Sequence, residues 1–182
     1  MTDKARRIAF PLSKREALAL FLACGFLIHP WILFNFFGNA DWLFERFNLP
    51  GMSVLAYFLV IGLIDTIVLF LLVYFIGIFI PRKLFGKDLV TFLSLVSWNI
   101  SLGMILIQFF LPPQQESSLP WIIGLVLFFI VFLTVIDGYF IRKRPALTEY
   151  ASNLIGRVEV LTAFFLVLDI FSIFIVIFRN IY

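Results

Sequence analysis

The segment SVLAYFLVIGLIDTIVLFLLVYFIGIFI, residues 53–80, decides the fold, because it spans 28 residues and carries a single charged one, Asp65. A transmembrane helix needs about 20 mainly apolar residues, so this segment can cross a bilayer with tilt or with a protruding end. Pro81 follows it and predicts where the helix ends. Four similar segments lie at about 16–37, 89–111, 120–141 and 158–178. We therefore expect an all-α, polytopic membrane protein: a bundle of five transmembrane helices forming a single domain over residues 1–182.

The composition is typical of a protein that lies almost wholly within a membrane. Of its 182 residues, 63% are hydrophobic and 14% are charged, and the mean hydropathy is +1.08. Five crossings and short loops use nearly this whole length, so we expect no globular catalytic module. The net charge of +3 comes from basic residues at the ends of apolar segments, where anionic lipid headgroups account for them. We expect the lipid bilayer as a partner and no nucleic acid, since no basic patch alternates with aromatic residues.

Lysine and arginine alternate from one gap between the apolar segments to the next. They are concentrated before the first segment and in the second and fourth gaps: Lys4, Arg6, Arg7, Lys14 and Arg15; Arg82, Lys83 and Lys87; Arg142, Lys143, Arg144 and Arg157. The remaining gaps and the C-terminal end hold only Arg46 and Arg179. Short loops rich in these residues stay on the cytoplasmic side. We expect the N-terminus inside, the C-terminus outside, and the cytoplasmic membrane of a prokaryote as the location.

Local signals predict how several segments begin, bend and connect. Ser13 and Glu16 have the spacing of a capping box before the first segment. Pro30 lies inside that segment and predicts a kink, because it lacks an amide donor. Residues 38–51 mix aromatic and charged side chains, which predicts a short interfacial helix. Residues 145–157 carry apolar side chains at helical spacing, which predicts a short amphipathic helix on the cytoplasmic leaflet.

Four polar residues from different segments are predicted to lie at the same depth in the bilayer. Counting about 1.5 Å per residue along each helix places His29, Asp65, Asn99 and Asp169 near the middle of the bilayer. Ionisable groups at this depth are costly, so each needs a partner or a function. We therefore predict a polar site in the middle of the membrane from these four residues.

One face of the fifth segment supports this site. Glu159, Thr162, Asp169 and Ser172 are separated by three, seven and three residues, so they lie on the same side of a helix. That side must point into the bundle or at a partner protein. The third segment is polar on two faces, which predicts a central position. Gly62 in the second segment predicts the close approach of another helix.

Three interpretations of these polar residues remain open. In the first, they form a proton or cation site, because burial favours the neutral form of a carboxyl and makes proton exchange feasible. In the second, they link helices as packing contacts. In the third, Asp65 and Asp169 meet a basic residue of another subunit. Ligand spacing typical of a metal site is missing, and one histidine excludes bis-histidine haem ligation within this chain. We expect neither a metal nor a cofactor. For Asp137 we expect a cationic partner among residues 142–144.

The stretch RKLFGKDLVTFLSLVSWN, residues 82–99, resembles the Yip family of small five-span membrane proteins, in which a basic turn containing glycine leads into a polar-aromatic span. The resemblance covers about half of the chain and implies a non-enzymatic membrane organiser or adaptor. Five spans with the C-terminus outside also resemble the N-terminal anchors of membrane-bound sulfatase-like enzymes. That second resemblance implies an anchor for a separate extracytoplasmic enzyme.

Catalytic motifs are missing from the sequence. It contains no H-E-x-x-H, G-x-S-x-G, C-x-x-C or Walker-type loop, so we do not expect an enzyme. Our leading hypothesis is an accessory subunit or scaffold of a membrane complex, which associates with other subunits or with itself. The alternatives are a proton- or cation-coupled transport component that uses the mid-membrane carboxylates, and the membrane anchor.

Overall fold

The computed structural model describes residues 12–39, 51–110 and 119–181, and within these ranges it contains helices and no strand. Five helices are long and apolar enough to cross a membrane. They are α1 (Lys14–Gly38), α3 (Gly51–Phe79), α5 (Leu89–Phe110), α6 (Leu119–Lys143) and α7 (Pro145–Ile181). Two short helices, α4 (Arg82–Phe85) and η1 (Gly86–Asp88), connect α3 to α5. The expectation of an all-helical chain with five candidate spans is confirmed for these residues.

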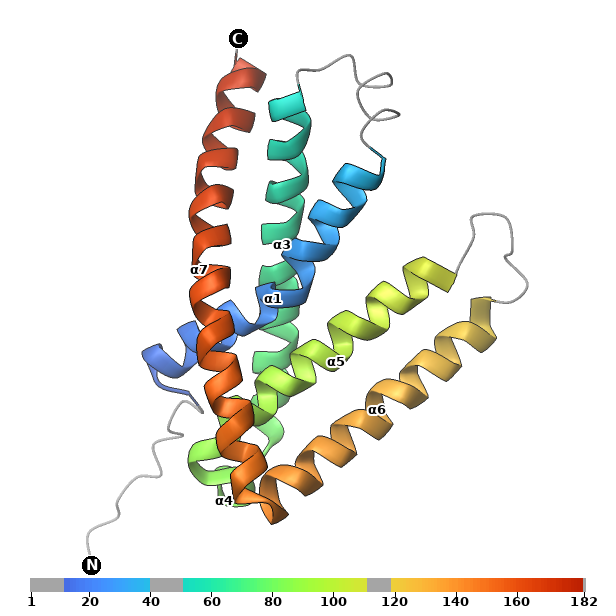
Figure 1. The fold of residues 1–182 in the computed structure, drawn as a ribbon, viewed down its shortest axis with the longest axis vertical. Coiled ribbons are helices and arrows are strands. Elements are labelled where there is room, and N and C mark those ends of the chain that lie inside the picture. Colours follow the sequence, from blue (N-terminus) through green and yellow to red (C-terminus); the bar gives the residue numbers. More distant parts are fainter. Residues whose placement is uncertain (1–11, 40–50, 111–118, 182) are drawn as a thin grey trace, which may run out of the picture.

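Helix α1 begins and bends as its sequence predicts. The backbone N–H of Glu16 donates to Ser13 Oγ at 3.3 Å, and the N–H of Ser13 donates to Glu16 Oε2 at 2.6 Å, which completes the capping box. Pro30 lies inside the helix, where its missing N–H leaves the carbonyl of Phe26 without its usual donor. Helix α1 changes direction along its length (Figure 1), as expected for a proline-containing helix.

The long helices form a packed group and a projecting hairpin. Helix α1 contacts α3, α5 and α7, whereas α5 and α6 form a hairpin that leans away from α3 and α7 toward one end of the molecule (Figure 1). Helix α5 contacts all four other long helices, in agreement with its predicted central position. Helix α6 packs mainly along α5 and is therefore peripheral.

Helix α7 is longer than the predicted fifth span. Its 37 residues correspond to about 55 Å, and they join the predicted amphipathic segment 145–157 and the predicted span 158–178 into one helix. In its first turns Leu147 and Tyr150 are exposed, while Thr148 and Ile155 are buried. The separate surface helix is therefore not observed. The interfacial helix predicted for residues 38–51 lies almost wholly outside the described residues.

The basic stretches gather at one end of the bundle. Arg82 Nη2 forms an ion pair with Glu16 Oε2 at 2.9 Å, which joins the start of α1 to α4. Lys87 of η1 and Arg142 of α6 line a common cavity, which places η1 beside the end of α6. Three regions that the sequence predicts to be on the same side of the membrane therefore lie at the same end of the structure.

Two glycines bring the helices around the candidate site close together. A Cβ added to Gly25 of α1 would lie 2.6 Å from Thr162 Cγ2 of α7. A Cβ added to Gly62 of α3 would lie 2.8 Å from Ile32 Cδ1 of α1. Real Cβ contacts are longer than this, so a side chain at either position would force its neighbour to move, and the glycines allow α1 to pass close to both helices. The close approach predicted at Gly62 is thus present.

Candidate functional site

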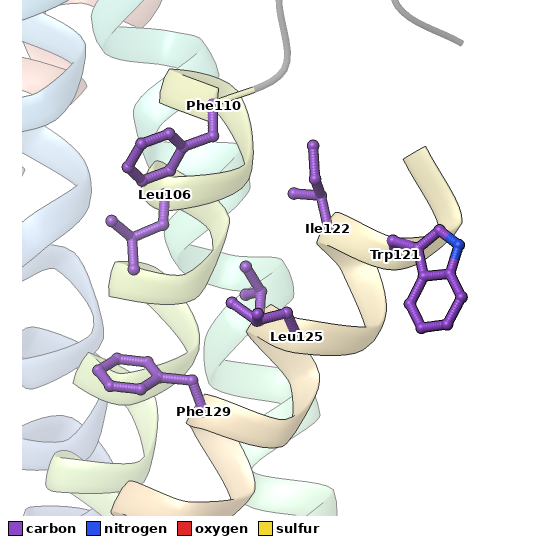
Figure 2. Close-up of a pocket in the computed structure, with 7 residues that line it drawn as sticks. Leu106, Phe110, Trp121, Ile122, Leu125 and Phe129 are labelled. Atoms are coloured by element: carbon purple, nitrogen blue, oxygen red, sulfur yellow. The ribbon is translucent and has the colours of Figure 1, made fainter. Parts of the chain in front are cut away.

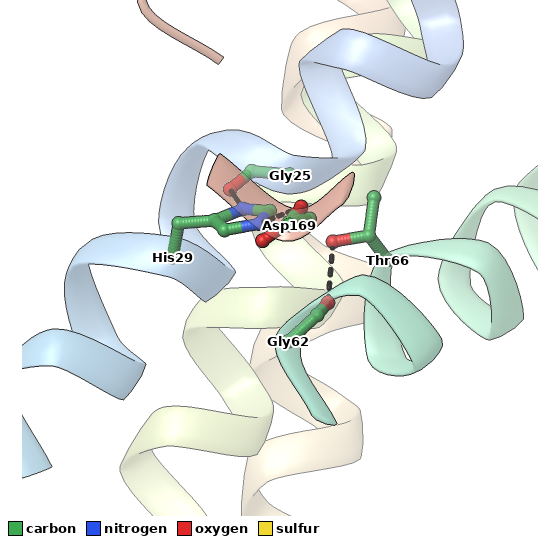
Figure 3. Close-up of polar contacts among 5 residues, drawn as sticks. All are labelled: Gly25, His29, Gly62, Thr66 and Asp169. Atoms are coloured by element: carbon green, nitrogen blue, oxygen red, sulfur yellow. Dashed lines mark hydrogen bonds and ion pairs between the residues drawn. The ribbon is translucent and has the colours of Figure 1, made fainter. Parts of the chain in front are cut away.

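His29 and Asp169 form a buried pair between α1 and α7. His29 Nε2 lies 2.8 Å from Asp169 Oδ2, and His29 Nδ1 lies 2.9 Å from the carbonyl oxygen of Gly25 (Figure 3). The exposed fractions of the two residues are 1% and 0%. Two of the four residues predicted to share a site are therefore in direct contact.

The contacts of the imidazole determine where its protons lie. A carbonyl oxygen only accepts hydrogen bonds, so Nδ1 must carry a proton and donate it to Gly25. One further proton is needed between His29 Nε2 and Asp169 Oδ2. It lies either on the imidazole, which makes an ion pair, or on the carboxyl, which leaves both groups neutral. Both forms are uncharged overall, but the ion pair carries the desolvation cost of two buried charges, which their mutual attraction repays only in part, whereas the neutral form avoids that cost.

The surroundings of the pair are apolar or hydroxylic. Phe165 stacks on the His29 ring with a centroid distance of 5.1 Å and an interplanar angle of 18°. On the α3 side, the hydroxyl of Thr66 donates to the Gly62 carbonyl at 2.8 Å (Figure 3). Within the described part of the chain, Asp169 Oδ1 is buried and has no hydrogen-bond partner. The carboxyl is therefore satisfied on one oxygen only.

The polar face of α7 points into the bundle. Thr162, Asp169 and Ser172 are all buried, and Glu159, one helical turn before Thr162, is half-buried. Arg15 of α1 is close enough to Glu159 to interact with it electrostatically. The residues that sequence spacing placed on one face therefore face α1 and α3 and not the lipid.

Asn99 lies in a different contact from the one predicted. Its amide Nδ2 donates to Asp137 Oδ2 at 2.7 Å, and both side chains are partly buried between α5 and α6. Asp137, for which we expected a cationic partner among residues 142–144, forms no ion pair among the described residues. Depth alone grouped Asn99 with His29, whereas packing directs the Asn99 side chain toward α6.

Asp65 is separate from both contacts. It is exposed on α3 and borders a cavity of about 230 Å³ between α1, α3 and α5. In the part of the chain that the structure describes, its carboxyl forms no hydrogen bond or ion pair. The four predicted residues therefore divide into a His29–Asp169 pair, an Asn99–Asp137 pair and an isolated Asp65.

Other polar groups around this cavity were not predicted. Ser101 lines it and has a buried hydroxyl without a partner among the described residues. Gln108 lines it too, and its Oε1 accepts from Trp31 Nε1 at 2.6 Å, which links α1 to α5. Both residues belong to the third predicted segment, whose polar residues on two faces were the only sequence signal, and that signal did not indicate which helix or cavity each face contacts.

A larger cavity lies between α5 and α6 near the described ends of the hairpin. It measures about 560 Å³ and is lined by apolar or aromatic side chains: Leu106, Phe110, Trp121, Ile122, Leu125, Val126 and Phe129. Figure 2 shows Leu106 and Phe110 of α5 across from Ile122 and Leu125 of α6. It offers no group for acid–base or ligand chemistry. Its surface suits a hydrocarbon chain.

Within the described ranges, no three His, Cys, Asp or Glu side chains are grouped so that they could hold a metal ion. The single thiol, Cys24, is free and buried. The expectation that the protein uses neither a metal nor a cofactor stays a prediction.

No known protein family, curated protein sequence or solved structure matches this chain. The resemblance of residues 82–99 to the Yip family therefore stays a prediction, and function has to be inferred from the site itself.

Proposed function

We propose that this chain is a non-enzymatic accessory subunit or scaffold of a membrane complex, which binds a second membrane protein through the face that carries Asp65. The observation behind the proposal is the isolation of that carboxyl. Asp65 lies 14 residues from each end of α3, so it would be near the middle of a bilayer. An ionisable group that faces lipid at this depth is costly unless another group pairs with it.

The surroundings of Asp65 suit a helix with a basic side chain. The neighbouring cavity is mainly apolar, with the unpartnered hydroxyl of Ser101 and the amide of Gln108 among its lining groups. These polar groups can donate hydrogen bonds to a partner side chain or accept them from it. The apolar residues around them would contact the surface of the partner helix. We infer that the partner contributes a transmembrane helix whose lysine or arginine side chain enters this cavity near the middle of the bilayer.

A second copy of this chain does not offer such a residue. All 14 lysines and arginines lie near the ends of the apolar segments or between them. The one mid-membrane imidazole, His29, is buried and already paired with Asp169. The proposed partner is therefore a different protein.

Native mass in mild detergent tests the proposal. We expect the parent protein to be part of a particle heavier than its own 21.1 kDa. Asp65→Leu should release the 21.1 kDa monomer, whereas Asp65→Glu, which keeps the carboxylate, should keep the complex. Replacing the central lysine or arginine of the partner by alanine should have the same effect as Asp65→Leu.

The same measurement can contradict the proposal. A parent protein that is strictly monomeric, or a complex that survives Asp65→Leu unchanged, would rule it out. A homodimer lost on Asp65→Leu would instead indicate pairing of two protonated carboxyls. Asp65 has no partner among the described residues, so Asp65→Leu should leave the unfolding temperature of the isolated chain unchanged. This check separates loss of binding from loss of folding.

A proton-coupled transport component is the second candidate, and the unpartnered Oδ1 of Asp169 favours it. A carboxyl that shares one proton with an imidazole could pass that proton on if its free oxygen met water. The cavity beside Asp65 does not have His29 or Asp169 among its lining residues. The accessory function therefore has the stronger support.

We also propose that the basic end of the bundle faces the cytoplasm of a prokaryotic cell, with the N-terminus inside and the C-terminus outside. The support is the gathering of the basic stretches at one end, together with the retention of such loops on the cytoplasmic side. In this orientation an extracytoplasmic enzyme anchored by the chain is one form that the partner could take.

A further inference from the structure

A groove on α6 combines an apolar wall with two basic side chains at one end. It measures about 450 Å³ and lies between α6 and the segment formed by α4 and the first turns of α5. Arg142 and Lys143 line it at the end of α6 where the basic stretches gather. This groove is on a different part of the molecule from Asp65, and the proposed accessory function does not use it.

The two basic groups are free to bind an anion. Arg142 and Lys143 are exposed, and among the described residues they form no ion pair. Among the described residues, no acidic side chain lines the groove. The adjoining cavity also contains Arg142, but there Asp88 and Glu149 balance its basic groups. The groove is therefore the more positive of the two spaces. The adjoining cavity also leaves free space beside the Arg142 side chain.

The apolar wall is built by aromatic stacking and a glycine. Phe85 and Phe92 stack with a centroid distance of 4.2 Å and an interplanar angle of 10°. A Cβ added to Gly138 would lie 3.4 Å from the ring of Phe92, so the missing side chain keeps the groove open along α6. Thr134, Gly138 and Arg142 line the groove at successive turns of α6, a length of about 12 Å.

We propose that this groove binds an anionic phospholipid, with its phosphate at Arg142 and Lys143 and one acyl chain along the wall formed by Phe85, Phe92 and Gly138. Basic pockets between transmembrane helices on the cytoplasmic side are suited to anionic headgroups. A free phosphate ion would satisfy the two cations but would leave the apolar wall without a ligand.

Lipid retention measured by native mass spectrometry tests this site. The full chain is purified in a neutral detergent and mixed with equal amounts of phosphatidylglycerol and phosphatidylcholine. We expect one phosphatidylglycerol to be retained in preference. The double variant Arg142→Gln/Lys143→Gln should weaken its retention about thirtyfold, which corresponds to two basic residues at about 1 kcal/mol each.

Two further variants distinguish lipid binding in the groove from non-specific attraction of an anionic lipid to a basic protein. Val135→Trp should also lower retention, because Val135 lines the groove and a larger side chain there would fill part of it. The substitution should not affect folding, because Val135 is 66% exposed. The control Lys83→Gln/Arg157→Gln removes two exposed charges outside the groove and should retain the lipid.

Three results would overturn the proposal. One is equal retention of both lipids by the parent. Another is an equal loss in the control and in Arg142→Gln/Lys143→Gln, which would indicate non-specific electrostatic attraction. The third is release of the lipid by millimolar inorganic phosphate, which would indicate a phosphate site with no contribution from the apolar wall. Unfolding temperatures in detergent without lipid should be alike for all variants, so a lower retention reports binding.

Discussion

At the scale of single residues, the pairing of His29 with Asp169 is the feature with the clearest consequence. Both residues are almost completely buried, and their contact joins α1 to α7. The second imidazole nitrogen is held by the Gly25 carbonyl, so the ring cannot rotate to find another partner without losing that bond. Removing the carboxyl should therefore leave His29 Nε2 unsatisfied in an apolar environment.

We predict that Asp169→Leu lowers the stability of the folded protein by roughly 0.5–2 kcal/mol, the range for polar contacts between helices in membranes. Asp169→Asn should be much milder, because an amide can still hydrogen-bond to Nε2. Thermal unfolding in detergent measures both, and Phe171→Leu, a change at an exposed position of the same helix, is the control. If Asp169→Leu is as stable as the parent, the pair is not a packing contact.

The same variants distinguish packing from transport. A transport function predicts that Asp169→Asn folds normally and abolishes proton flux into reconstituted vesicles, since an amide cannot exchange a proton. A purely structural pair predicts that Asp169→Asn leaves any proton flux of the parent unchanged. Flux that is present in the parent and unchanged in Asp169→Asn would exclude Asp169 from the transport path.

At the scale of helices, glycines determine how closely the elements pack. Gly25 brings α1 to α7, and Gly103 brings α5 to the side chains of Ile130 and Val126 on α6. In a bilayer there is no hydrophobic driving force between helices, so close van der Waals packing contributes much of the association. Such positions should be sensitive to a single added methyl group.

We predict that Gly25→Ala destabilises the protein by about 1–3 kcal/mol, the usual cost of overpacking, because the new Cβ would meet Thr162 Cγ2. The stability loss should be partly recovered in Gly25→Ala/Thr162→Ser, which removes that methyl group and keeps the hydroxyl that donates to Val158; the His29 ring atoms, 3.1 and 3.2 Å from the new Cβ, account for the remainder. Gly124→Ala and Gly156→Ala, where no atom lies within 4 Å of the added carbon, should not destabilise the protein, since alanine favours the helix more than glycine does. If the double variant is destabilised as much as Gly25→Ala alone, the contact with Thr162 does not explain how α1 crosses α7.

At the scale of the whole molecule, α5 connects the group formed by α1, α3 and α7 to the peripheral helix α6, and the basic stretches lie at one end. Helices α1, α3 and α7 meet around the His29–Asp169 pair, while the α5–α6 hairpin projects from them (Figure 1). The ion pair between Arg82 and Glu16 holds the connection after α3 beside the start of α1. Five crossings, an odd number, would place Met1 and Tyr182 on opposite sides of the membrane, as the proposed orientation requires.

We predict that reporter fusions after Tyr182 and within residues 112–120 give extracytoplasmic signals, and that a fusion between Lys83 and Lys87 gives a cytoplasmic one. The physical reason is the retention of short basic loops on the cytoplasmic side. An alkaline phosphatase fusion and a green fluorescent protein fusion at each position provide opposite readouts. Cytoplasmic signals at both outer positions would refute the orientation.

The sequence by itself was sufficient to predict the helices. The predicted segments 53–80, 89–111 and 120–141 differ by no more than two residues at either end from α3, α5 and α6. The capping box and the inward face of α7 were also predictable, because capping and helical periodicity depend on residues only a few positions apart. The continuity of residues 145–181 was not predicted, since no local signal distinguishes a break from a continuous helix there.

Only the tertiary structure decided which polar residues meet. Hydropathy and residue counting give the depth of a side chain, but not the direction in which it points or the helix that it faces. In a membrane both the lipid and the bundle interior accept apolar side chains, so apolar periodicity does not identify the inner face. The pairing of Asn99 with Asp137, and the isolation of Asp65, follow from how α5 packs against α6 and how α1 crosses α3 at Gly62.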